Sequence, residues 1–198
     1  MLHNLAWTAR GAILGAIIGA ILADSPGVAG ERMIAAQDVL AAITADWTGD
    51  GGMDRAVLVD NRDGMADLLI YSEQDGTMTL AAVSEALAWI GSAWGTLPEI
   101  ALSPNGALQV VSMNEAIGRH RWRETLTVVY REGRFIVGGY TYRAYDTLDL
   151  DYEYGCDINL ITGMGVFNNA AFRSPIDALP VGKWGGDGIT SPDLCPAN

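Results

Sequence analysis

Short apolar runs separated by glycine-containing dipeptides dominate the chain after Arg55. The runs are rich in Val, Leu, Ile, Thr and Tyr, which is typical of β-strands. No helix-length segment alternates with them, so a parallel α/β sheet is not expected. The predicted strands cover residues 55–60, 66–72, 77–83, 107–113, 124–130, 134–143, 156–161 and 164–168.

The dipeptides between these runs supply the positive φ angles that tight hairpins require. They are Asp63-Gly64, Asp75-Gly76, Asn105-Gly106, Glu132-Gly133 and Thr162-Gly163. The pattern therefore predicts an all-β fold, an antiparallel meander of about eight strands. One or two propeller-blade-like sheets, or a curved open sheet, fit this order best.

The segment before the first run, residues 31–45, has two interpretations. Glu31 to Gln37 can form a short helix, after which Val39, Ala41, Ile43 and Ala45 alternate as in a strand. Alternatively, abundant alanine and the spacing of its apolar residues allow one helix over the whole segment. We prefer a short helix followed by a strand.

The N-terminus is typical of a secretory signal peptide. Arg10 precedes the apolar run Gly11–Ala23, and small residues follow Pro26. The run is short for a bilayer span, so we expect cleavage near Ala29 or Gly30 and a periplasmic or secreted protein. The alternative is an uncleaved N-terminal anchor. The predicted organisation is a signal peptide over residues 1–29 and one domain over 30–198, with an irregular tail from 175.

Charge and cysteine content limit the classes of partner and the cellular compartments that we expect. The formal net charge of −12 argues against nucleic acid and anionic membranes, and suits exposure to divalent ions. Cys156 and Cys195 are the two cysteines of the chain. In an oxidising compartment we expect them to form a disulfide worth on the order of 4 kcal/mol. Buried thiols or an intermolecular bridge are the alternatives.

The segment from residue 46 to 54 has the spacing of a calcium loop. Calcium takes oxygen ligands, which a tight loop supplies from alternate residues, with a glycine at the sharp turn. Gly51 stands at loop position 6, and Val57 occupies position 12, where an EF-hand requires Glu. The predicted ligands are Asp46, Thr48, Asp50, Gly52 and Asp54. Gly52 would bind through its carbonyl oxygen, and the other four through their side chains.

Residues 39–60 resemble the calcium loop of integrin-type FG-GAP repeats, in which an Asp/Asn-rich loop with a central Asp-Gly precedes a hydrophobic strand. Residues 135–142 and 156–163 also resemble the tail of small exported bacterial proteins with such loops. The resemblance implies bound Ca²⁺ and a loop that joins two strands of a propeller blade. Thr48 stands where Asn or Asp is usual, and the Phe-Gly and Gly-Ala-Pro pairs are lacking. The alternative is that Asp50-Gly51-Gly52 is simply a turn.

Other candidate residues lie in three segments. His120 is flanked by arginines that we expect to pair with neighbouring carboxylates. Trp89 and Trp94 fall in the segment 84–97, predicted to be a loop, where they either stack on a ligand or belong to the core or a lid. A third segment is acidic and holds Asp146, Asp149, Asp151, Glu153 and Asp157, with Tyr145, Tyr152 and Tyr154 among them.

The acidic segment allows a solvated loop, a second calcium site or an acid/base pair. The sequence favours an exported, calcium-binding β module that binds a protein or glycan of the cell envelope or exterior without catalysis. The alternative function is a small secreted carbohydrate-active hydrolase that uses carboxylates in 146–157.

Overall fold

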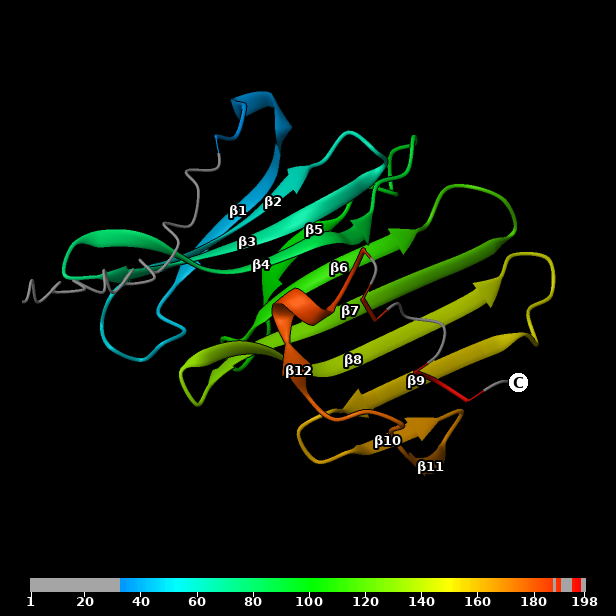
Figure 1. Cartoon of the computed structure of the whole chain (residues 1–198). Coiled ribbons are helices and arrows are strands. Elements are labelled where there is room, and N and C mark those ends of the chain that lie inside the picture. The colour runs from blue at the N-terminus through cyan, green and yellow to red at the C-terminus, as the bar shows by residue number, and fades with distance from the viewer. Residues whose placement is uncertain (1–32, 187, 190–193, 197–198) are drawn as a thin grey trace, which may run out of the picture. The chain divides into compact units, whose positions relative to one another are not determined.

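Two antiparallel sheets contain most of the chain that the structure describes, as Figure 1 shows. The computed structural model describes residues 33–186, 188–189 and 194–196. The smaller sheet is a sequential meander of β1 (Val39–Ala45), β2 (Asp54–Asp60), β3 (Met65–Gln74) and β4 (Thr77–Trp89). Its order is that of a propeller blade, because each strand pairs with the next along the chain.

The larger sheet continues the meander in the order β11-β10-β9-β8-β7-β6-β5, and β12 pairs with β8. Its strands are β5 (Glu99–Leu102), β6 (Leu108–Asn114), β7 (His120–Arg131), β8 (Arg134–Asp146), β9 (Glu153–Asn159), β10 (Met164–Phe167), β11 (Ala170–Arg173) and β12 (Leu179–Pro180). The predicted all-β antiparallel fold is confirmed. The five predicted hairpin glycines all have positive φ: Gly64, Gly76, Gly106, Gly133 and Gly163.

The start of the described chain is a single 3-10 turn, η1 (Ala36–Asp38), followed directly by β1. The interpretation of residues 31–45 as one helix is therefore wrong, because Val39–Ala45 pairs with β2. The predicted signal peptide lies outside the described residues. Among the residues that are described, none belongs to a helix of the length and hydrophobicity that a membrane crossing requires.

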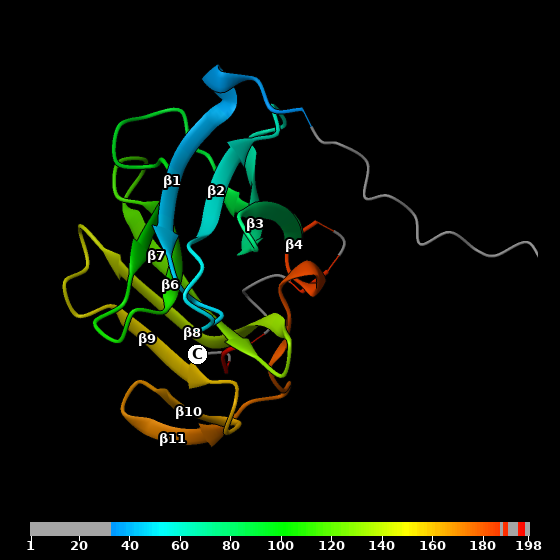
Figure 2. The same ribbon diagram turned by 90° about the vertical axis from the view of Figure 1, so that its left-hand side faces the viewer.

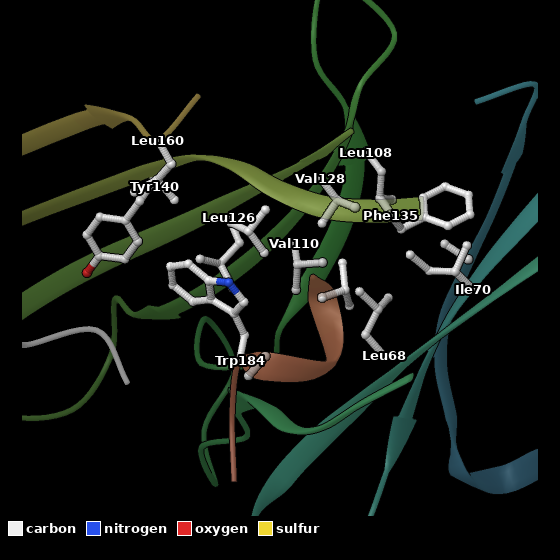
Figure 3. Close-up of a cluster of buried hydrophobic side chains, with 14 of the residues drawn as sticks. Leu68, Ile70, Leu108, Val110, Leu126, Val128, Phe135, Tyr140, Leu160 and Trp184 are labelled. Carbon is white, nitrogen blue, oxygen red and sulfur yellow. The ribbon is translucent and has the colours of Figure 1, made fainter. Parts of the chain in front are cut away.

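One hydrophobic core joins the facing sides of the two sheets. Figure 3 shows Leu68 and Ile70 of β3 directed toward Leu108, Val110 and Val128 of the larger sheet. Alternate residues of a strand share a face, so Leu68 and Ile70 enter this core together. Leu69, between them, lies in a small second cluster on the other face, with Val57 and Val59.

A bulge in β4 contacts the C-terminal tail, where the Ala86 carbonyl accepts a hydrogen bond from the Gly186 N–H at 3.4 Å. The pairing shifts between Ala66 and Leu68, and Ala86 in the bulge has a φ of 47°. The buried Asp67 carboxylate accepts a hydrogen bond from the Ala86 N–H at 2.9 Å. Because β4 extends through the bulge to Trp89, the prediction of a loop over 84–97 is wrong for its first six residues.

The C-terminal tail packs onto the core through Trp184 and the disulfide. The Trp184 side chain is 3 % exposed and stacks on Tyr140 of β8. The turn before it, η2 (Val181–Lys183), lies beside β4 in Figure 2. Cys156 and Cys195 form the predicted disulfide. The tail is therefore held at Trp184 by packing and at Cys195 by a covalent bond.

Candidate functional site

The predicted calcium loop joins β1 to β2 and curls around the Asp46 side chain. The two carboxylate oxygens of Asp46 accept hydrogen bonds from the Gly49 N–H at 2.7 Å and the Gly51 N–H at 3.0 Å. Both glycines have positive φ, 76° and 90°, which permits this tight course. The Thr48 hydroxyl also points at Asp46, at 3.5 Å.

Asp54 closes the other end of the loop and is fully buried. Its Oδ2 accepts hydrogen bonds from the Trp47 N–H at 2.9 Å and the Thr48 N–H at 3.0 Å. Its Oδ1 faces the Glu73 N–H of β3 at 3.4 Å. The Asp54 carboxylate therefore holds the loop against the smaller sheet by hydrogen bonds to backbone N–H groups.

Asp50 and Glu73 both lie close to Gly52. Asp50 is exposed and accepts a hydrogen bond from the Gly52 N–H at 2.8 Å. A Cβ on Gly52 would lie 2.6 Å from Glu73 Oε2, so a side chain here would collide with Glu73. Glu73 is therefore a fourth carboxylate beside the loop. It could not be predicted from the spacing within the loop, because it is distant from the loop in the sequence.

The donor chemistry of this loop fits calcium, because carboxylate and carbonyl oxygens are its preferred ligands. Within the described residues, however, no three Asp, Glu, His or Cys side chains are close enough to form a metal site. The loop carboxylates are directed at backbone N–H groups instead. Asp46 and Asp50 are exposed and can rotate toward an ion, whereas Asp54 is enclosed.

A second candidate site is an aromatic pocket on the core side of the larger sheet. Trp122 of β7 pairs with Ala144 of β8, which pairs with Tyr154 of β9. Paired residues point to the same face, so the Ala144 methyl lies at the bottom of a gap between two aromatic side chains. The cavity has a volume of about 390 Å³.

The next row of the sheet supplies two further sides of the pocket. Tyr142 stands between Glu124 and Cys156 in the pairing of β7, β8 and β9. Its ring lies nearly parallel to that of Trp122, at 19°, and nearly perpendicular to that of Tyr154, at 85°. The rings therefore line the pocket on two roughly perpendicular sides.

Two contacts outside the sheet fix the rim of this aromatic pocket. The Tyr154 hydroxyl donates to the carbonyl of Pro196 at 3.0 Å, next to the disulfide. Tyr152 is in edge contact with His120, and both Tyr152 and Cys195 line the cavity. The turn between β8 and β9 and the C-terminal tail thus both contribute to the pocket.

Glu124 lines the pocket beside Tyr142 and is half-buried. Burial raises the pKa of the Tyr142 phenol, and the Glu124 carboxylate raises it further. Burial also raises the pKa of the Tyr154 phenol. Both tyrosines are therefore neutral at physiological pH, and Glu124 is the one carboxylate among the described residues that line the cavity.

The acidic segment 146–157 does not form a carboxylate face. Asp149 and Asp151 lie in the turn after β8, because the Asp146 carboxylate accepts the N–H groups of Leu148 and Asp149. Glu153 and Asp157 lie on β9, in register with Tyr145 and Thr141 on the face opposite the aromatic pocket. Asp149, Asp151, Glu153 and Asp157 are all exposed.

Two of the three arginines around His120, Arg119 and Arg123, lie beside carboxylates, as predicted. Arg119 Nε lies 2.6 Å from Asp146 Oδ2, and His120 Nδ1 lies 3.1 Å from the same oxygen. Arg123 lies 3.6 Å from Glu99.

The two candidate tryptophans do not share a surface. Trp94 is 94 % exposed on its loop. Trp89 ends β4 and contacts the Trp122 ring, so it supports the aromatic pocket from behind. The site residues predicted from the sequence do not include Trp122, Glu124, Tyr142 and Ala144, whose common signal is alternation along β7 and β8. That signal becomes informative only when the register of the two strands is known.

Asp146 gives a prediction for the pH dependence of stability. Burial alone raises its pKa, but the Arg119 hydrogen bond and the two backbone N–H groups outweigh burial and lower the pKa to about 2. Because the pKa of Asp146 is lower in the folded than in the unfolded protein, its ionised carboxylate stabilises the fold above about pH 4. This contribution is lost as the pH falls toward 2. Urea unfolding at pH 5 and pH 2.5 should therefore show the difference between the parent and Asp146→Asn shrinking at low pH. The exposed Asp149→Asn is the control, and a difference that does not change with pH would refute the role of Asp146.

Comparison of the chain with protein-family models, with curated proteins and with solved structures gave no match.

Proposed function

We propose that this protein is an exported, calcium-binding β module that binds a partner in the cell envelope or outside the cell and does not catalyse a reaction. The observation that carries the proposal is the Asp46–Asp54 loop, which joins neighbouring strands of a four-stranded meander. The FG-GAP resemblance implies a calcium loop at this position. Ca²⁺ would be held by Asp46, Asp50 and Asp54, by Thr48 and by the Gly52 carbonyl.

The hydrogen bonds of the loop are compatible with a cation. Each carboxylate oxygen has more than one lone pair, so the oxygens of Asp46 and Asp50, which accept at most one backbone N–H each, keep an acceptor position. Asp54 Oδ2 already accepts two N–H groups, so Asp54 would offer Oδ1. Asp46 already bends the chain around itself through Gly49 and Gly51. Glu73, beside Gly52, adds negative charge at the same edge of the loop. A bound Ca²⁺ would offset the repulsion among these carboxylates.

The aromatic pocket supports binding more than hydrolysis. A glycosidase uses two carboxylates about 5–9.5 Å apart across the scissile bond. Among the described lining residues the pocket offers Glu124 alone. The carboxylates that the hydrolase alternative needs are held elsewhere, Asp146 by Arg119 and Asp157 by the Thr141 hydroxyl at 2.8 Å.

Export is supported by the predicted signal peptide and is compatible with the Cys156–Cys195 disulfide, a bond typical of oxidising compartments. Intact-mass analysis of the periplasmic or secreted fraction should give a chain that begins near Gly30. Recovery of the uncleaved chain alone would contradict cleavage.

Calcium should raise the melting temperature of the purified protein. An ion that binds only the folded state stabilises it by about 2.7 kcal/mol at a hundredfold excess over Kd, which corresponds to roughly 5–10 °C for a domain of this size. Magnesium should have a much smaller effect, because it requires a tighter octahedral site and loses water reluctantly.

Asp50→Ala is the sharpest variant for this test. Asp50 is exposed and accepts a backbone hydrogen bond from Gly52, so its loss should change the calcium-free melting temperature little. It should nevertheless remove most of the calcium effect. Asp63→Ala, an exposed aspartate in the next turn, is the matched control and should retain the effect. Identical melting of the parent with calcium and with chelator would mean that the loop is only a turn.

A further inference from the structure

A polar hollow lies on the face of the larger sheet opposite the aromatic pocket. It is centred on Gly155 of β9, between β8 and the turn that joins β10 to β11 (Figure 1), and is called the Gly155 hollow below. Its volume is about 300 Å³. The polar side chains that line it are those of Arg143, Glu153, Asp157, Asn168 and Asn169.

Neither the backbone nor the packing of the described residues requires glycine at position 155. Gly155 does not have a positive φ, and the pairing of β9 with β8 runs through it without a register shift. A Cβ here would lie 3.6 Å from Arg143 Nη1 and 3.9 Å from Asn168 Oδ1, which is ordinary van der Waals contact. Glycine weakens the interior of a strand, and it often marks a place where a ligand approaches closely. The absence of a side chain at Gly155 therefore keeps the hollow open.

The strand register places polar side chains on four sides of Gly155. Arg143 of β8 is its partner in the pairing, and on the other side Asn168 Oδ1 accepts the Gly155 N–H at 2.8 Å. Glu153 and Asp157 come two residues before and two residues after Gly155, so they share its face of β9. A guanidinium, an amide and two carboxylates therefore border one hollow.

Donors and acceptors around the hollow are still available for a ligand. The side chains of Arg143 and Glu153 form neither an ion pair nor a hydrogen bond with another described residue. Asp157 Oδ2 accepts the Thr141 hydroxyl at 2.8 Å, which leaves Oδ1. A guanidinium has five N–H donors, and an ionised carboxylate has about four acceptor positions. A ligand in the hollow can therefore both donate and accept hydrogen bonds.

We propose that the Gly155 hollow binds one residue of a neutral oligosaccharide. The inference rests on the proposed function as a binding module and names a glycan as its partner. Each sugar hydroxyl is both a donor and an acceptor, so neighbouring hydroxyls can donate to Glu153 and Asp157 and accept from Arg143. An anion would meet the two carboxylates, and a simple cation would meet the guanidinium. The mixed charges of the hollow therefore favour a neutral ligand with many hydroxyl groups.

Tyr145 provides an aromatic surface next to the hollow. It pairs with Glu153, so it stands on the same face of the sheet, and it is 45 % exposed. Its hydroxyl donates to Glu115 Oε2 at 2.7 Å, which holds the ring in place. An exposed phenol ring has an apolar face that can pack against the C–H groups of a sugar. A second sugar residue can therefore lie over Tyr145 while the first occupies the hollow.

The test is calorimetric titration of the purified, disulfide-bonded protein with five neutral hexasaccharides. The probes are cellohexaose, maltohexaose, mannohexaose, xylohexaose and chitohexaose. At least one should bind with a Kd of about 1 mM or tighter. Hexagalacturonate, an anionic probe of the same length, should bind at least about tenfold more weakly, because its carboxylates would meet Glu153 and Asp157. Failure of all five neutral probes to bind, or tighter binding of the galacturonate, would overturn the proposal.

Variants of exposed residues locate the binding. Gly155→Val fills the hollow without removing a polar group, and valine suits a strand, so the melting temperature should not fall. It should weaken the sugar that binds by at least about tenfold. Arg143→Gln should weaken it similarly, whereas Arg134→Gln at the exposed start of the same strand should not. If Gly155→Val does not fold, Arg143→Gln still decides the question.

Two outcomes with variants would place the ligand elsewhere. Sugar binding that is lost in Trp122→Leu but kept in Gly155→Val would assign the sugar to the aromatic pocket and contradict this site. Sugar binding that requires calcium in the Asp50→Ala background, and that Glu153→Gln abolishes, would make the hollow a metal site. A chelator should instead leave the affinity for the sugar unchanged.

A further arm distinguishes the source of the sugar. Cosedimentation with the insoluble polymer of the sugar that binds would assign the ligand to a wall or matrix polysaccharide. Binding of the soluble hexasaccharide alone would assign it to a free oligosaccharide, and both results support the site. If no neutral sugar binds while calcium still raises the melting temperature, this inference fails and the calcium module stands. The opposite pair of results would refute the calcium loop alone.

Discussion

Asp54→Ala is expected to destabilise the calcium-free protein by about 4 kcal/mol, because hydrogen bonds to a buried charge contribute about 1.5–3 kcal/mol each and the freed donors lose their partner. Asp54 is fully buried and accepts the N–H groups of Trp47 and Thr48, and it faces that of Glu73. Its loss leaves three backbone donors without this acceptor at the end of β1 and at β3. Urea unfolding in the presence of chelator measures the effect.

Asp50→Ala is the control for this prediction, since it removes the same chemical group from the same loop. Its carboxylate accepts one backbone hydrogen bond and is exposed, so the expected loss is below about 1 kcal/mol. The two variants thereby separate the structural role of Asp54 from the ligand role of Asp50. Equal losses for both would mean that Asp54 does not hold the loop in place.

Removal of the disulfide should be the second large effect. Cys156 and Cys195 are 39 residues apart, and a cross-link over such a loop contributes about 4 kcal/mol in the chain-entropy model. The double variant Cys156→Ala/Cys195→Ala should therefore melt roughly 10 °C lower than the parent. The tail residues Leu194 and Pro196 would lose the bond that holds them near Tyr154.

Reduction provides the control for the disulfide. Dithiothreitol should lower the melting temperature of the parent to that of the double alanine variant, and should not affect the variant itself. A melting temperature that is insensitive to both the reductant and the substitutions would show that the tail is held by Trp184 and Leu194 alone.

The sequence was sufficient to predict the long strands and the hairpins between them. Their apolar runs and dipeptides such as Asp75-Gly76 are local signals, and the φ of 76° at Gly76 is what such a turn requires. The short strands β5 and β11 have only four residues each, too few to show a clear alternation, although they pair with strands next to them in the chain. The pairing of β12 with β8 joins residues that are distant in the chain, so it leaves no local signal. The extension of β4 past Ser84 depends on Asp67, which stabilises the bulge at Ala86 through a side-chain hydrogen bond.

The candidate sites, too, could be predicted only where their residues are close together in the sequence. The loop from Asp46 to Asp54 is contiguous, so its oxygen spacing could be read directly, but the approach of Glu73 to Gly52 depends on how β3 pairs. The aromatic pocket draws on three strands and the tail, and its floor is an alanine with no chemical signature of its own. The environment of Asp146 was also hidden, since Arg119 is 27 residues away in the sequence.

Isothermal titration of calcium into the chelator-treated protein tests the central claim most directly. The proposal predicts saturable binding of about one ion per chain, governed by the oxygen ligands of the loop. Asp50→Ala should remove most of the heat of binding, and Asp63→Ala should retain it. No saturable heat with the parent, or the same binding curve for the parent and Asp50→Ala, would contradict a calcium site at Asp46–Asp54.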